Sequence, residues 1–308
     1  MTARIRIAGY QGPASINTEA LQRLCAALAA ADPLSALPPH DLCADVTAAG
    51  GSAQRLFTDL EAGSVQIGYM ASGYLTARVP ELGVLDLPFC APERARAHAA
   101  LDGTVGMRLR DEIARQTGLR VLGFWDNGFR HITSRTGPLR HPRDCRGLKL
   151  RTLDNPIYVE TMAALGFEPL VTDVAELRAA VAEGRVDAQE NPLTNTVSFD
   201  LHRHHGHVAL TRHFHGVILL VAHAGFLDAL APAQRDTLAA ASRAATSLQR
   251  RRADEEETAA LATLRQAGVR ITAEPELDRD AFRAAAAPVL ARAQARLPDT
   301  LVAQYLGA

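Results

Sequence analysis

Short apolar runs alternate with stretches of helical periodicity along the first half of the chain. Apolar side chains recur at helical spacing over residues 15–31, and Ser52 is placed to cap a second helix that ends at Gly63. Strand-like runs occupy residues 4–10, 42–48, 65–70 and 119–124. This alternation predicts an α/β fold in which the sheet is largely parallel.

The last third of the chain reads as helical. Leu, Ala and Thr recur at helical spacing over residues 232–268, where residues 250–257 form a dense run of charges. Opposite charges lie four residues apart in this run, which favours a solvated helix face over a partner-binding patch. A strand over residues 269–272 and a helix from residue 280 to about residue 297 complete the pattern.

The unit of capped helix, glycine and strand occurs twice, over residues 52–68 and residues 173–188. Chance repetition is the alternative, because α/β proteins contain many such units. If this repeat is a true internal repeat, the chain holds two related lobes. The loops after the two strands, residues 71–74 and 189–192, are then equivalent. Ligands bind beyond the carboxyl ends of strands in open α/β sheets, so both loops are expected to face a ligand cleft between the lobes.

Length and charge limit the classes of function. At 308 residues the chain fits two lobes better than one core, and its net charge of −1 favours neither nucleic acid nor an anionic membrane surface. No apolar run approaches the roughly 20 residues that cross a bilayer, so the chain is not expected to be embedded in a membrane.

The four cysteines, Cys25, Cys43, Cys90 and Cys145, show no C-x-x-C spacing, which argues against a zinc site or a redox pair. A disulfide between Cys25 and Cys43 is permitted in an oxidising compartment. The alternative is that all four are small, buried or half-buried thiols.

Arg151 is the leading candidate for a binding residue. It ends a short strand-like run and precedes a helix start at Asn155 and Pro156. A guanidinium in that position can aim its planar fork of donors into a cleft and hold a carboxylate through two parallel hydrogen bonds. The sequence therefore points to the capture of a small organic acid.

Two further segments carry side chains suited to a small ligand. In residues 125–133, Gly128 permits a turn between two strands, Arg130 offers a second charged fork, and Trp125 and Phe129 offer apolar walls. The alternative is that Arg130 pairs with a surface carboxylate and Trp125 belongs to the core.

In the second segment, residues 189–193, the amide of Asn191 can both donate and accept hydrogen bonds. Asn-Pro is also an ordinary turn signal. Glu190 beside it is expected to be structural, because a carboxylate facing an anionic ligand would repel it.

Histidines crowd residues 201–215, which include His213. Imidazoles bind zinc or copper, so a metal site is one interpretation. The segment lacks an H-E-x-x-H arrangement, and its arginines favour a solvated basic surface. Elsewhere the sequence shows no nucleophile elbow, P-loop or dinucleotide fingerprint, so neither catalysis nor a cofactor is expected.

Four segments in the same order resemble the solute-binding subunits of TRAP transporters, the DctP-type family: residues 79–89, 125–133, 142–151 and 184–192. The resemblance implies a periplasmic binding protein of two α/β lobes with mixed sheets and a long C-terminal helix that spans the lobes. The expected boundaries are residues 1–124 with about 208–250 for lobe I, and about 125–207 with 251–308 for lobe II. The missing secretion signal fits a mature chain.

The resemblance also implies closure around an organic anion, which is delivered to the membrane permease subunits of a sodium-driven transporter. The carboxylate-gripping arginine of the family falls on Arg151, the second cleft arginine on Arg130 and the cleft asparagine on Asn191. Further candidate contacts are Ser72, Gly73, Tyr74, Tyr10, Gln11, Asn17 and His213. Members are mostly monomers, so a monomer is expected.

Closure is expected to place Trp125, Phe129 and Tyr74 where they exclude water. One alternative is a carboxylate sensor that presents its closed lobes to a receptor. Another is an enzyme on a two-lobed α/β fold, which would need an acid or base aimed into the cleft.

Overall fold

A computed structural model describes residues 4–91 and 93–307, and the chain divides into two compact units. Unit 1 comprises Met1–Ala71, Gly106–Asp126 and Ile218–Asp254. Unit 2 comprises Ser72–Val105, Asn127–Val217 and Glu255–Ala308. Each unit is therefore assembled from three separate stretches of sequence.

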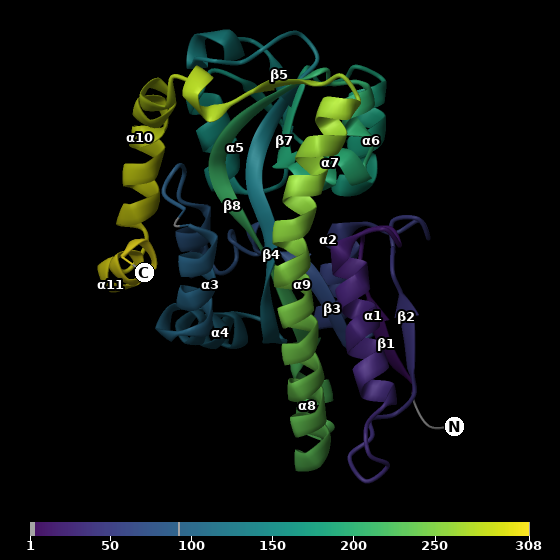
Figure 1. Ribbon diagram of the computed structural model, residues 1–308. Coiled ribbons are helices and arrows are strands. Elements are labelled where there is room, and N and C mark those ends of the chain that lie inside the picture. Colours follow the sequence, from purple (N-terminus) through teal and green to yellow (C-terminus); the bar gives the residue numbers. More distant parts are fainter. Residues whose placement is uncertain (1–3, 92, 308) are drawn as a thin grey trace. The chain divides into compact units, whose positions relative to one another are not determined.

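Unit 1 contains an α/β sheet in which neighbouring strands follow the order β2-β1-β3-β8 (Figure 1). Strand β1 pairs in parallel with β2 and β3, whereas β3 pairs with β8 in the antiparallel direction. The elements that lie wholly in this unit are β1 (Ile5–Ala8), α1 (Ile16–Ala29), β2 (His40–Cys43), α2 (Ala53–Glu61), β3 (Ile67–Ala71) and α8 (Ala224–Ala229).

In unit 2 neighbouring strands follow the order β4-β7-β5-β6, and β9 pairs with β8. Strand β5 pairs in parallel with β6 and β7, and β7 pairs with β4 in the antiparallel direction. Its elements are α3 (Arg94–Asp102), β5 (Lys149–Thr152), α5 (Pro156–Ala164), β6 (Glu168–Val171), α6 (Val174–Ala182), β7 (Ala188–Pro192), α7 (Leu193–Ser198), β9 (Arg270–Thr272), α10 (Arg279–Ala295) and α11 (Asp299–Leu306).

Four elements belong to both units. They are α4 (Thr104–Gln116), β4 (Leu119–Ser134), β8 (His207–His223) and the 35-residue helix α9 (Pro232–Gln266). The α/β class, the mixed sheets and the long helix are thus confirmed. Among the residues that the structure describes, none of the helices combines the length and apolar character needed to cross a bilayer.

The helix caps form as the sequence predicts. Ser52 accepts a hydrogen bond from the Arg55 amide, and Asp173 accepts one from the Ala175 amide. Gly63 and Gly184 follow the two nine-residue helices with φ values of +71° and +72°, a conformation that favours glycine. Both segments therefore form the capped helix and glycine end that the sequence predicts.

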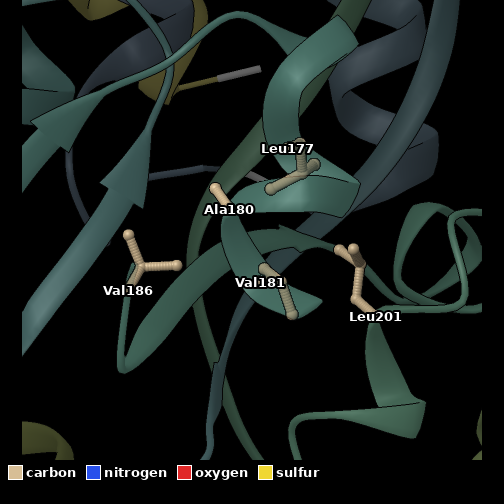
Figure 2. Packing of buried hydrophobic residues seen from close by; sticks show 5 residues of the cluster. All are labelled: Leu177, Ala180, Val181, Val186 and Leu201. Carbon is tan, nitrogen blue, oxygen red and sulfur yellow. The ribbon is translucent and has the colours of Figure 1, made fainter. Parts of the chain in front are cut away.

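A small apolar cluster anchors α6 within unit 2 (Figure 2). Leu177, Ala180 and Val181 project from one face of α6 and meet side chains from the segments on either side of β7. The buried members are Leu177, Ala180, Val181, Val186 and Leu201. Burial of this face holds α6 beside the strand that carries Glu190 and Asn191.

Three local expectations were wrong. Residues 119–134 form the single strand β4, with Gly128 inside it at a φ of +83°, rather than two strands joined by a turn. Residues 189–192 lie within β7 rather than in a loop after it, because they pair with β4 from Arg130 to Thr133. The predicted second strand is shifted to His40–Cys43 by its register with β1.

Candidate functional site

Arg151 is held by its own unit along one edge of the guanidinium. It lies in β5, is 2% exposed, and donates from Nε at 2.9 Å and from Nη2 at 2.5 Å to the backbone carbonyl oxygen of Thr172. Neither hydrogen bond uses Nη1. The edge formed by Nη1 and Nη2 is the one with capacity to bind a carboxylate in a bidentate manner.

The charge of Arg151 has no counterion in contact. Among the described residues, no carboxylate forms an ion pair with it, and its two hydrogen bonds to Thr172 end on a neutral carbonyl. Burial lowers the pKa of Arg151, and the nearby Tyr74 and Glu190 oppose that shift. A buried cation without an anion favours the binding of one, because the cost of its desolvation is then offset.

Tyr74 lies beside Arg151 and belongs to the 3₁₀ turn η1 (Ser72–Tyr74), which also holds the candidates Ser72 and Gly73. Burial raises the pKa of Tyr74, while the Arg151 guanidinium and its hydrogen bond to the phenol oppose the rise. The hydroxyl is therefore protonated at neutral pH and accepts from the arginine. Within unit 2 the structure brings these two predicted residues together.

The turn η1 is tied to the start of α5 through Asn155. The Asn155 amide nitrogen donates to the Gly73 carbonyl at 3.3 Å and to the Asp86 carboxyl at 2.7 Å, while its oxygen caps α5. Thr76 donates to the same Asp86 oxygen at 2.7 Å. Burial of Asp86 raises its pKa to about 6, although Thr76, Asn155 and Tyr158 act in the other direction.

Arg130 is neutralised by Glu190. Its Nε and Nη2 donate to the two carboxylate oxygens, and Nη2 also reaches the Glu190 backbone carbonyl at 2.8 Å. Thr152 donates to Glu190 at 2.9 Å, and His213 Nε2 lies 3.5 Å from the carboxylate. Burial would raise the pKa of Glu190, but Arg130 and His213 outweigh it and lower the pKa to about 2.

These contacts decide between the two sequence interpretations of Arg130. The arginine does pair with a carboxylate, but that carboxylate is buried rather than at the surface. Glu190 is structural, as predicted. Arg130 keeps only Nη1 outside its hydrogen bonds to described residues, so Arg151 carries the uncompensated charge.

Asn191 lies on the same strand with its amide oriented. Its Oδ1 accepts from Arg130 Nη2 at 3.4 Å and from Asn195 at 3.3 Å. Its Nδ2 donates to Gln189 at 2.6 Å. Two lone pairs and one of two amide protons are therefore used.

The prediction of a solvated histidine segment was wrong for His205, His213 and His215. All three are buried, because residues 207–223 form strand β8 and His205 lies beside β4 against Thr133. His213 accepts or donates a 2.7 Å hydrogen bond with Thr211 in addition to its contact with Glu190. Burial lowers its pKa, and Glu190 opposes that shift.

Phe129 is packed within unit 2 rather than open. The Arg212 guanidinium lies 3.8 Å from the centre of its ring, and the His215 ring lies 4.9 Å away. The phenyl ring is 4% exposed. Arg212 adopts a φ of +46°, which places it in the left-handed region that non-glycine residues seldom occupy.

Four predicted residues belong to unit 1. Trp125 is 1% exposed and donates from Nε1 to Thr246 at 3.0 Å. The Tyr69 ring lies between those of Trp125 and Tyr10, at 5.8 and 5.1 Å. Gln11 accepts a 3.1 Å hydrogen bond from Asn17, whose oxygen accepts from Gln249 at 3.0 Å.

Sequence reasoning missed Asp86, Tyr158 and Gln189. Tyr158 stacks on Phe214 with ring centres 4.0 Å apart, and the Arg130 guanidinium lies 5.4 Å from the tyrosine ring. A signal existed for Asp86, since it is the one charged residue in an apolar run that begins at Leu82. All four cysteines are free, so the possible bond between Cys25 and Cys43 is not formed.

The chain matches a family model over residues 47–297, which covers most of its length. The description of that family is bacterial extracellular solute-binding protein, family 7. A solute-binding protein of Verminephrobacter eiseniae is 31% identical over 80% of this chain and 72% of its own length. The 2,3-diketo-L-gulonate-binding periplasmic protein of Escherichia coli is 29% identical over 75% of this chain and 70% of its own.

The fold is shared with solved structures of the same kind. The sugar acid binding protein of Advenella mimigardefordensis, solved in complex with galactonate, superposes with a TM-score of 0.91 at 25% identity. The match covers 99% of this chain and 97% of the other. The two-unit α/β architecture is therefore that of known solute-binding proteins.

Proposed function

Because this chain belongs to bacterial extracellular solute-binding protein family 7, we propose that it captures a small organic anion and delivers it to a TRAP-type membrane transporter. The observation that carries the proposal is the buried Arg151 guanidinium. It is positioned by two hydrogen bonds to Thr172 and has no anion in contact among the described residues. A ligand carboxylate supplies the missing negative charge.

Arg151 and Tyr74 are the core of the proposed contact set. The carboxylate binds the edge of Arg151 formed by Nη1 and Nη2, and Tyr74, whose oxygen accepts from the arginine, donates its proton to the ligand. Arg130 contributes through Nη1 and Asn191 through its amide nitrogen. Ser72, Gly73, Phe129 and His213 are further candidate contacts in unit 2, and Tyr10, Gln11, Asn17 and Trp125 remain separate candidates in unit 1.

Affinity requires more than the arginine. A dissociation constant of about 1 μM corresponds to about −8.2 kcal/mol, whereas one hydrogen bond to a charged group contributes roughly 1.5–3 kcal/mol net. The ligand must therefore carry further oxygen atoms that meet further donors. Diketogulonate and galactonate, the ligands named for two similar proteins, have that composition. Sugar acids are thus the class that we propose.

Binding and release, rather than turnover, is the proposed activity. The two carboxyls with strongly shifted pKa values, Asp86 and Glu190, form hydrogen bonds with neighbouring side chains in unit 2 and serve to hold the site. The family description places its members outside the cytoplasm, and we propose the periplasm for this chain. Presentation of the bound form to a receptor would use the same capture step.

A thermal-shift screen of ligand-stripped protein tests the proposal. The panel contains sugar acids, dicarboxylates, 2-hydroxy acids and amino acids. A ligand at 100 times its dissociation constant adds about 2.7 kcal/mol to stability, a clear shift. Shifts confined to carboxylates and lost in Arg151→Ala support the proposal, and equal shifts in wild type and Arg151→Ala contradict it.

A further inference from the structure

Five polar side chains in unit 2 form one continuous hydrogen-bonded chain. Arg130 Nη2 donates to Asn191 Oδ1 at 3.4 Å, Asn191 Nδ2 contacts Gln189 Oε1 at 2.6 Å, and Gln189 Nε2 contacts Thr133 Oγ1 at 2.8 Å. Thr133 Oγ1 then contacts His205 Nδ1 at 2.8 Å. Every member is 4% exposed or less. Water therefore has little access to replace any link.

The hydrogen-bonded chain runs in a single donor-to-acceptor direction from Arg130 to Thr133. A guanidinium can only donate, so the oxygen of the Asn191 amide must face Arg130 and its nitrogen must face Gln189. Gln189 then presents its oxygen to Asn191 and its nitrogen to Thr133. The Thr133 hydroxyl, having accepted from Gln189, also hydrogen-bonds Nδ1 of His205, and the tautomer of the imidazole sets which of these two atoms donates.

His205 ends the hydrogen-bonded chain in either tautomer of its neutral ring, because the Thr133 hydroxyl can both donate and accept. Burial is the largest cause that lowers the pKa of His205, to about 4, and the neighbouring Arg135 acts in the same direction. The ring is therefore neutral at neutral pH and adds no positive charge beside Thr133. Reversal of either amide would set two donors or two acceptors against each other at buried positions.

The fixed direction determines what Asn191 can offer a ligand. Both lone pairs of its oxygen are used by Arg130 and Asn195, and one amide proton is used by Gln189. What remains is one N–H donor. Arg151 pairs in register with Gln189, and Asn191 lies two residues further along β7, on the same face of the sheet.

We propose that Gln189, Thr133 and His205 are positioning residues that hold Asn191 as a hydrogen-bond donor, so that the site selects acids with an acceptor oxygen beside the carboxylate and rejects 2-amino acids. The inference rests on the proposed function, since Arg151 must first hold the carboxylate. The remaining capacity of Arg130, Arg151 and Asn191 consists of donors. An ammonium group, itself only a donor, finds no acceptor among these three residues.

Three six-carbon probes that differ at one atom test the selectivity: D-gluconate, 2-deoxy-D-gluconate and 2-amino-2-deoxy-D-gluconate. Calorimetry is expected to show gluconate binding at least about tenfold more tightly than the amino acid, with the deoxy acid between them. Equal or tighter binding of the amino acid overturns the inference. Failure of all three to bind contradicts the proposed sugar-acid function instead, which is a different result from binding without selectivity.

Substitutions within the hydrogen-bonded chain of side chains test whether that chain causes the selectivity. Thr133→Val keeps the shape of the side chain but removes the link to His205, and Gln189→Met removes both central links. Each is expected to reduce the ratio of the two dissociation constants about two- to tenfold. An unchanged ratio in a folded Thr133→Val protein overturns the assignment.

Thr161→Val is the matched control. Thr161 is also fully buried in unit 2, in α5, and its hydroxyl has no hydrogen-bond partner among the described residues. The substitution therefore removes a buried hydroxyl without breaking a hydrogen bond. The selectivity ratio is expected to stay at the wild-type value, which separates the loss of the chain from any general effect of apolar substitution.

Discussion

Arg151 and Thr172 are joined by two hydrogen bonds, because Nε and Nη2 of the arginine both donate to the one carbonyl oxygen of Thr172. Thr172 directly follows β6, the strand that pairs with the β5 strand of Arg151. The guanidinium is consequently fixed before any ligand arrives. Such preorganisation reduces the entropy that binding must overcome.

Substitution of Arg151 by lysine is expected to weaken carboxylate binding about ten- to hundredfold. Lysine keeps the charge, but it loses the planar fork and the two bonds to Thr172 that fix its position. Calorimetry with the acid that gives the largest thermal shift measures the change. Wild-type affinity in Arg151→Lys would show that the fork is not the contact.

Arg178→Lys serves as the control for that experiment. Arg178 also donates to a backbone carbonyl in unit 2, that of Ser198, but at an exposed position. Its substitution is expected to leave the affinity unchanged. The comparison separates the loss of an exposed arginine from the loss of the buried one that Thr172 positions.

Glu190→Gln is expected to lower the free energy of unfolding by about 3–5 kcal/mol, because it leaves the buried Arg130 charge without its anion. Urea unfolding at neutral pH measures the loss. Glu183→Gln, at an exposed position paired with Arg185, should change stability by less than about 1 kcal/mol. A similar small loss in Glu190→Gln would mean that Arg130 finds another partner or water.

The carboxyl of Asp86 is expected to make stability depend on pH between about 4 and 6. Its folded pKa is raised from 3.8 to about 6, so the folded state binds the proton more tightly than the unfolded chain does. The contribution is complete below pH 3.8 and is lost as pH rises through 6. Glu190, with its lowered pKa, acts in the opposite direction and at lower pH, from 4.5 down to about 2.

Asp86→Asn is the variant that isolates this effect. Asparagine keeps an oxygen that can accept from Thr76 and Asn155 but does not titrate. The difference in unfolding free energy between wild type and variant is expected to shift in favour of the variant, by roughly 3 kcal/mol between pH 4 and pH 7. A pH-independent difference would show that Asp86 keeps its ordinary pKa.

Leu177→Ala is expected to cost about 2–5 kcal/mol of stability. The side chain is fully buried in the cluster of Figure 2, and its removal leaves a cavity under α6. Leu34→Ala, at a position that is 94% exposed, is the control and should be nearly neutral. Urea unfolding of both variants checks the comparison.

Local chemistry made part of the fold predictable. Ser52, Asp173, Gly63 and Gly184 act through their own backbone geometry, so their sequence positions specified the helix ends. β4 was not predictable in this way, because the strand continues through Gly128 and its residues from Arg130 to Ser134 pair with β7. Pairing of that kind depends on residues far away in sequence.

In the candidate site, too, some residues were predictable from local sequence and others were not. The position of Arg151 at a strand end was predictable from its short apolar run and the cap that follows. The burial of His205 and His213 was not predictable, because the polar residue types in residues 201–215 are typical of an exposed segment. The side chains that they contact, Thr133 and Glu190, lie on other strands.

The composition of the two units from interleaved stretches has a consequence for synthesis. Strand β3 of unit 1 has no antiparallel neighbour until residues 218–222 of β8 have left the ribosome, and that unit ends only at Asp254. Unit 2, likewise, receives β9, α10 and α11 last. Neither unit can finish folding on a half-made chain, so the nascent protein must keep its unpaired strand edges from aggregating until translation is nearly complete.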